Sequence, residues 1–114
     1  MFREDMEALL LFFSTFPDVA SARQIGTLLV ERQLAACVNL VPAIESIYRW
    51  QGKLETAAET LAIFKTTAAT YPAFEKLLAD LHPYQVPEIL ALHPTQVPAS
   101  YRAWVCNEVG ISTE

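Results

Sequence analysis

Glycine is scarce in this chain, which has only Gly26, Gly52 and Gly110 among its 114 residues. Glycines so far apart cannot form a phosphate-binding P-loop or a dinucleotide-binding fingerprint, because both need two or more glycines within a few residues. The Gly-x-Ser-x-Gly motif of many hydrolases is absent as well. The sequence therefore excludes most of the nucleotide chemistry that depends on glycine-rich loops.

The chain also contains few cysteines, few basic residues and no long apolar run. Two cysteines, Cys37 and Cys106, are too few for a disulfide framework and are expected to be free thiols. The net charge is −5 and the eight Lys and Arg residues are scattered, so we expect no binding to nucleic acid. The apolar run at 8–13 is far shorter than a membrane span and lacks the basic start of a signal peptide. We therefore expect a cytoplasmic protein that makes no contact with a membrane.

What is present is enough apolar material for one core, since 53% of the residues are hydrophobic. We expect a single domain over residues 1–114. Apolar periodicity and the positions of proline predict seven elements. These are a strand at 8–14, a helix at 19–33, strands at 36–50 and 60–65, a helix at 72–81, a strand at 86–92 and a final helix at 98–105. This order is typical of an α+β, ferredoxin-like split βαβ fold, in which helices cover one face of a four-stranded antiparallel sheet.

The predicted strand at 36–50 is unusually long. Strict alternation puts Val38, Leu40, Ile44, Tyr48 and Trp50 on one face. Fully extended, the strand would span roughly 45–50 Å, whereas a compact domain of this size has a radius of gyration of roughly 13 Å. The hairpin must therefore bend at Pro42 within a monomer or project from the domain. A projecting hairpin would expose apolar side chains, so it predicts a homo-oligomer in which sister chains cover them.

Candidate metal ligands are few. None of the cysteines and histidines has a recognised zinc-binding spacing. Cys37 begins the second strand and His82 leads into the fourth, so the two could converge at one end of the sheet and hold a metal ion. His82 also precedes a proline at the end of a helix, where a histidine can interact favourably with the helix dipole without any metal.

A second group of polar residues lies near the hairpin and the fourth strand. Lys65 occupies an apolar strand and would need a partner if it were buried, and Glu59 and Glu88 are the nearest candidates. Such a pair could be structural or could hold an anionic ligand. Tyr48, Trp50 and Tyr84 combine an apolar body with a polar tip, which suits a pocket wall or a subunit interface.

Four motifs in the same order resemble the CutA divalent-cation tolerance family. They are Ala-Ala-Cys-Val-Asn at 35–39, Tyr48-x-Trp50-x-Gly52-Lys53, Lys65-Thr66, and His-Pro-Tyr-x-Val-Pro-Glu at 82–88. The resemblance extends from about residue 8 to residue 105. It implies a ferredoxin-like homotrimer related in architecture to PII signalling proteins, with long hairpins that reach into neighbouring subunits. It also implies a part in the tolerance of copper and other divalent metals, and no firm catalytic activity.

The resemblance also suggests roles for particular residues. Cys37 and His82 match positions proposed to contact metal, and residues lining a cleft between subunits are matched by Trp50, Lys65, Tyr84 and Glu88. With Glu59, these four form our candidate binding cleft. Some family members have a cysteine where this chain has Ser14, and its loss weakens the prediction of a soft copper(I) site.

The leading hypothesis is thus a cytoplasmic, trimeric, non-enzymatic protein that binds copper or another divalent cation between subunits. One alternative is a PII-like regulatory module that binds a small anionic metabolite or a partner protein in the same cleft. An acylphosphatase-like enzyme could share the fold, but it would need a glycine-rich anion cradle, which the sequence lacks.

Overall fold

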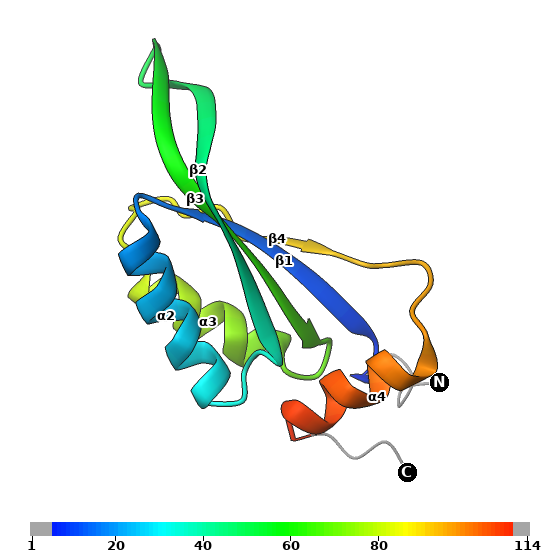
Figure 1. The fold of residues 1–114 in the computed structure, drawn as a ribbon. Coiled ribbons are helices and arrows are strands. Elements are labelled where there is room, and N and C mark those ends of the chain that lie inside the picture. The colour runs from blue at the N-terminus through cyan, green and yellow to red at the C-terminus, as the bar shows by residue number, and fades with distance from the viewer. Residues whose placement is uncertain (1–5, 111–114) are drawn as a thin grey trace.

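The structure, a computed structural model, describes residues 6–110. Its elements, labelled as in Figure 1, are β1 (Leu9–Phe16), α2 (Val19–Glu31), β2 (Cys37–Trp50), β3 (Lys53–Thr67), α3 (Tyr71–Leu81), β4 (Leu90–Leu92) and α4 (Ala99–Glu108). The four strands form one antiparallel sheet in the order β2-β3-β1-β4. The predicted α+β class and the four-stranded antiparallel sheet are confirmed. None of the described helices combines the length and the apolarity that crossing a bilayer requires.

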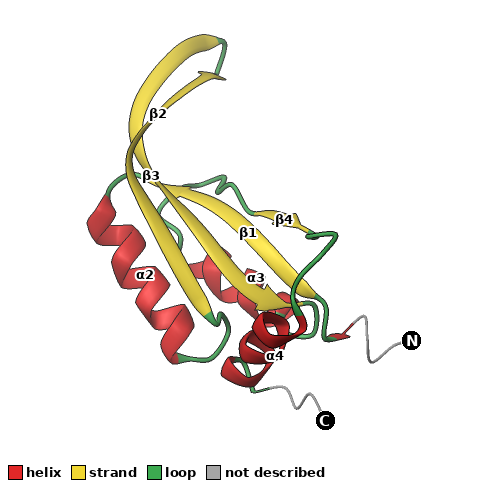
Figure 2. Cartoon of the chain, turned by 45° about the vertical axis from the view of Figure 1, so that its right-hand side comes forward, coloured by secondary structure: helices red, strands yellow, loops and turns green. Residues whose placement is uncertain are grey.

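Helices α2 and α3 lie side by side on one face of the sheet (Figures 1 and 2). Helix α2 begins at its cap Asp18, whose side chain accepts a hydrogen bond of 2.7 Å from the backbone N–H of Ser21. Its apolar stripe is buried, and Gly26 brings the helix close to β2, because a Cβ there would lie 3.1 Å from Val38. Helix α4 lies apart from the other two, where Val105 and Val109 pack on Leu9.

The core lies between the sheet and helices α2 and α3. It contains alternate residues of β1 and β3, and its centre is a cluster of phenylalanines. The ring of Phe74 from α3 lies 4.6 Å from Phe12 and 5.0 Å from Phe64, centroid to centroid, in the tilted arrangements that aromatic pairs prefer. Burial of each such side chain is worth about 1.5–3 kcal/mol. This packing fixes which face of β1 and β3 is buried in the core, and it leaves the odd-numbered residues of β3 on the other face.

The β2–β3 hairpin extends well beyond the helices (Figure 1). Its strands have 14 and 15 residues, and β3 begins at Lys53 rather than at the predicted residue 60. The chain is 51 Å long and has a radius of gyration of 15.0 Å. A compact domain of this size would have a radius of gyration of roughly 13 Å. The predicted projection is confirmed, and it leaves Ile47 and Leu54 66% and 72% exposed.

A β-bulge interrupts β2 between Val41 and Ile44. Before the bulge Leu40 pairs with Ala62, and after it Ile44 pairs with Glu59, so β2 contains one extra residue. The extra residue moves the following even-numbered side chains to the opposite face of the sheet. The prediction that one face runs from Val38 to Trp50 was therefore wrong.

The last part of the chain contains less strand than predicted. The strand expected at 86–92 consists only of Leu90–Leu92, which pairs with β1. Pro83 and Pro87 lack an N–H to donate to a ladder, so the chain from His82 to Ile89 runs as a loop. This loop passes the end of β1 and reaches the base of the hairpin, where the pocket described below is found.

Candidate functional site

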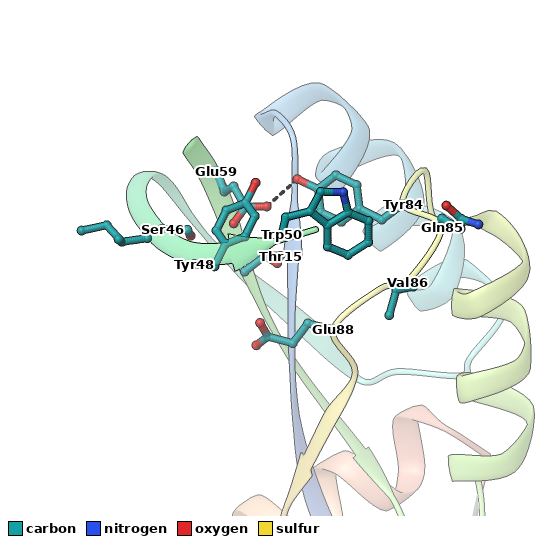
Figure 3. A pocket seen from close by; sticks show the side chains of 10 residues that line it. Thr15, Ser46, Tyr48, Trp50, Glu59, Tyr84, Gln85, Val86 and Glu88 are labelled. Atoms are coloured by element: carbon teal, nitrogen blue, oxygen red, sulfur yellow. Dashed lines mark hydrogen bonds between the residues drawn. The ribbon is translucent and has the colours of Figure 1, made fainter. Parts of the chain in front are cut away.

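A pocket of about 580 Å³ lies between the hairpin and the loop that follows α3 (Figure 3). The hairpin curves (Figure 2), so residues near its turn and near its base border the same pocket. The lining residues come from three parts of the chain: Thr15 of β1, Ser46, Ile47, Tyr48, Trp50 and Glu59 of the hairpin, and Tyr84, Gln85, Val86 and Glu88 of the loop. Because of the bulge, Ser46, Tyr48 and Trp50 share the face of Glu59.

The loop is attached to the hairpin by a hydrogen bond from the hydroxyl of Tyr84 to the carboxylate of Glu59 (Figure 3). Burial, together with this bond and the negative charge of Glu59, raises the pKa of the Tyr84 hydroxyl well above its usual range. Tyr84 is therefore a neutral donor at physiological pH, and it holds one side of the Glu59 carboxylate in place.

Glu88 provides a second carboxylate at the exposed rim of the pocket. Partial burial of the carboxyl and the negative charge of Glu59 raise its pKa. Among the lining residues there is no Lys, Arg or His. The electrostatics of the pocket thus favour a positive ligand and disfavour a negative one.

His82 supports the loop from beneath. Its Nε2–H donates to the carbonyl of Thr15 at 2.9 Å, and its Nδ1 accepts from the backbone N–H of Tyr84 at 3.1 Å. The ring also stacks on Phe16, with 4.4 Å between the centroids, and it is only 8% exposed. Burial lowers the pKa of His82, and the bond to Thr15 and the charge of Glu59 oppose this only in part. Both ring nitrogens are thus occupied, and the histidine is neutral.

Cys37 lies far from His82. Cys37 pairs with Lys65 on β3, and Lys65 pairs with Leu11 on β1. His82 instead contacts Thr15 and Phe16, which lie four and five residues beyond Leu11 on β1. At about 3.3 Å per residue the separation along the strand alone is about 13 Å or more. Cys37 instead has its sulfur 3.9 Å from the hydroxyl of Tyr101 in α4. The prediction that Cys37 and His82 converge at one end of the sheet was wrong within a single chain.

Lys65 is also absent from the pocket. Its ammonium group donates to the side-chain oxygen of Asn39. Both Lys65 and Glu59 lie on β3, and the rise per residue of a strand places them roughly 20 Å apart. The expected pairing of Lys65 with Glu59 or Glu88 was therefore wrong within a single chain, because those carboxylates lie at the other end of the sheet. The structure brings together four of the five residues of the candidate cleft, namely Trp50, Glu59, Tyr84 and Glu88.

Within residues 6–110, no three His, Cys, Asp or Glu side chains are grouped so that they could hold a metal ion. Two carboxylates line the pocket, and one of them already accepts a hydrogen bond from Tyr84. Divalent metals usually take at least four ligands. The ligand atoms that one chain supplies are therefore too few to hold a resident metal ion tightly.

Several lining residues were not predicted. Thr15 and Ser46 are small polar residues on strands, with no pattern that distinguishes them from other surface positions. Gln85 and Val86 lie within the His82–Glu88 motif but carry no distinctive chemistry. Only the three-dimensional course of the loop past the hairpin could have identified them.

The similarity of this chain to known proteins is extensive. The family model described as "CutA1 divalent ion tolerance protein" matches residues 10–108. The chain belongs to the CutA1 divalent ion tolerance family. It is 43% identical over 105 residues to the divalent-cation tolerance protein CutA of Thermus thermophilus, with 92% of this chain and 100% of that protein covered. It is 43% identical over 93 residues to protein CutA of Mus musculus, with 82% of this chain covered, and it spans about half (52%) of that relative's length.

Solved structures of CutA proteins share the fold. The crystal structure of CutA from Xylella fastidiosa superimposes with a TM-score of 0.87 at 41% identity, covering 90% of this chain and 98% of that chain. The structure from Thermus thermophilus gives 0.86 at 41% identity, covering 90% and 99%. The predicted membership of the CutA family is confirmed.

Proposed function

We propose that this CutA1 family protein acts in divalent-cation tolerance as a cytoplasmic, non-enzymatic, homotrimeric binding protein. The observation that supports the role most is the match over residues 10–108, together with similarity along the entire length of a relative that is named for divalent-cation tolerance. The copper or other divalent cation would be bound weakly, as a cargo rather than a resident cofactor.

The pocket supports a site completed by a neighbouring subunit. Glu59 and Glu88 offer carboxylate oxygens on a surface with no opposing positive charge, which favours a cation. One described chain has too few ligands there, and the exposed hairpin beside the pocket is the part of the molecule most in need of a partner. A second chain could thus cover the apolar hairpin and add the missing donors.

Metal titration tests this proposal. Isothermal calorimetry of the wild-type protein with Cu²⁺ and Zn²⁺ should show binding with a dissociation constant in the micromolar range or weaker. Glu59→Gln and Glu88→Gln should each weaken it tenfold, or by about 1.4 kcal/mol, because each removes a charged oxygen ligand. The matched control Glu31→Gln, on an exposed residue at the end of α2, should leave it unchanged.

Two further variants examine the ligands that the sequence predicted. Unchanged affinity in Cys37→Ser, and a loss in His82→Gln no larger than that in Glu59→Gln, would support the carboxylate site, because His82 supports the loop that carries Tyr84. A large loss of metal affinity in either variant, with no loss in Glu59→Gln and Glu88→Gln, would show that the thiol or the imidazole binds the metal instead of the carboxylates. Absence of any binding by the wild-type protein would overturn the metal-binding part of the proposal.

The size of the pocket favours a second candidate, a PII-like regulatory module that binds a small molecule. Pockets of about 300–1,000 Å³ are typical of small-molecule sites. The volume of this pocket falls within that range. Because no basic residue lines it, the anionic metabolite suggested by the sequence is disfavoured. A thermal-shift screen would test this candidate, since a ligand that binds the folded state raises the melting temperature.

A further inference from the structure

The walls of the pocket combine aromatic rings with carboxylates. Figure 3 shows the rings of Tyr48, Trp50 and Tyr84 gathered on the side of Glu59, with Glu88 below them in this view. Trp50 and Tyr48 are 46% and 43% exposed in the single chain, so the side chains of that chain leave part of both rings open to a ligand. The face of an aromatic ring is electronegative and attracts a cation within about 6 Å of its centre.

The two carboxylates are not equivalent. Glu59 already accepts a hydrogen bond from the hydroxyl of Tyr84, which fixes the position of its carboxylate. Glu88 has no hydrogen bond or ion pair to any residue in the described range 6–110, and its only charged neighbour of note is Glu59. A positive group placed between them would relieve their mutual repulsion and would give Glu88 a partner.

This combination suits an organic cation better than a bare metal ion. A metal ion needs four or more oxygen, nitrogen or sulfur ligands at about 2.0–2.6 Å, and aromatic faces supply none of them. An alkylammonium or guanidinium group instead needs one or two carboxylates as hydrogen-bond acceptors, with apolar or aromatic surface around its hydrocarbon part. The pocket supplies both.

We propose that the pocket between the hairpin and the loop after α3 binds a small organic cation, an alkylammonium or guanidinium compound. Its charged group lies between Glu88 and Glu59, and its hydrocarbon part lies against Trp50 and Tyr48. This inference rests on the same pocket as the proposed function, but it does not require that any metal ion binds there.

The direct test compares cations with neutral molecules of the same shape. In a Trp104→Phe background Trp50 is the only tryptophan, so its fluorescence reports on the pocket. Titration with butylguanidinium should change this fluorescence at micromolar to millimolar concentrations, and the neutral isostere butylurea should bind at least about tenfold more weakly. Equal binding of the two compounds would overturn the inference without the use of any site variant.

Variants then locate the site, with calorimetry as the readout for all of them. Glu88→Gln should weaken butylguanidinium binding about tenfold, and Trp50→Leu about fivefold, while Glu31→Gln should not change it. Melting curves show whether each variant is folded. Retained affinity in both folded pocket variants would overturn the inference.

Titration of the same samples with Cu²⁺ and Zn²⁺ separates this inference from the proposed function. Binding of metal without binding of butylguanidinium would sink the inference alone. Binding of butylguanidinium without metal would support the inference and sink the metal-binding part of the proposed function.

Discussion

His82, next to the pocket, is held by both of its ring nitrogens and by the ring of Phe16. Its two ring nitrogens position the loop that carries Tyr84, because one bonds to β1 and the other to the backbone of Tyr84 itself. Tyr84 in turn holds Glu59. A residue that resembles a metal ligand in sequence is thus part of the support for the pocket, and its protonation should be linked to stability.

We predict that the protein loses stability as the pH falls from about 6.5 towards 5. Burial lowers the pKa of His82 in the folded state. Below the ordinary value of about 6.5 the unfolded chain therefore takes up a proton that the folded chain rejects. The free energy that neutral His82 contributes to folding is fully present above pH about 6.5. It is lost as the pH falls towards the pKa of His82 in the folded state. The slope from one such group is at most about 1.4 kcal/mol per pH unit.

Urea unfolding at several pH values measures this effect. His82→Gln should flatten the slope between pH 5 and 7, whereas the same change at the exposed His93 should not. Titration of the His82 ring followed by NMR gives the direct check, and a midpoint above about 6.5 would contradict the prediction.

Ser14 is a second residue with a measurable consequence. It is fully buried, and its hydroxyl has no hydrogen-bond partner among the described residues. Because a buried hydroxyl without a partner costs free energy, Ser14→Ala should raise the free energy of unfolding by about 0.5–1 kcal/mol. Thermal or urea unfolding measures it.

Thr66 provides the matched comparison. It is also fully buried, but its hydroxyl donates to the carbonyl of Leu34 at 2.7 Å. Thr66→Val removes that donor and keeps the shape, so it should lower stability by about 1 kcal/mol. If Ser14→Ala lowered stability as much as Thr66→Val, the Ser14 hydroxyl would have a hydrogen-bond partner in the folded protein, contrary to the prediction.

At the scale of elements, the β-bulge decides which side chains form the pocket. Ala43, inside the bulge, has a positive φ, in the left-handed region that non-glycine residues avoid. Ala43→Gly should remove that strain and keep the register, so we expect unchanged binding and a gain of about 0.5–1 kcal/mol in stability.

Deletion of Ala43 should have the opposite effect. Without the extra residue, regular pairing would turn Ser46, Tyr48 and Trp50 away from Glu59. We therefore expect a lower melting temperature and a red shift of Trp50 emission in the Trp104→Phe background. If the deletion variant had the same Trp50 emission and the same stability as Ala43→Gly, the bulge would not determine which face of the sheet carries Tyr48 and Trp50.

The type and order of the elements could be predicted because periodicity and proline positions signal them locally. The lengths could not be predicted so well. The first half of β3, from Lys53 to Glu59, has a polar sequence that gives no strand signal, and it is a strand because β2 pairs with it. In the fourth strand, predicted at 86–92, apolar residues suggested more pairing than Pro87 permits.

The membership of the candidate site was harder to predict than the fold. Glu59 and Glu88 both line the pocket, but Lys65 lies six residues further along β3 than Glu59. Six residues of strand separate the two by roughly 20 Å. The face of Tyr48 and Trp50 depends on a single extra residue, and alternation alone cannot reveal it.

For the whole molecule, the principal question is what covers the hairpin. Its side chains Ile47 and Leu54 are among the most exposed large apolar side chains of the described residues, at 66% and 72%. We predict a particle of three times the chain mass of 12.7 kDa. Its melting temperature should rise with protein concentration, because association stabilises the folded chain. Sedimentation equilibrium at micromolar concentration measures the mass.

Leu54→Glu should weaken this assembly, because burial of a leucine is worth about 1.5–3 kcal/mol and each chain would lose that amount. The expected result is a shift towards monomer by a factor of about ten or more per interface, with the fold of the monomer retained by circular dichroism. Glu55→Gln, on the neighbouring exposed residue, changes charge without removing apolar surface and should leave the mass unchanged. A wild-type protein that sediments as a folded monomer at these concentrations would contradict the proposed trimer and would require the pocket to function within one chain.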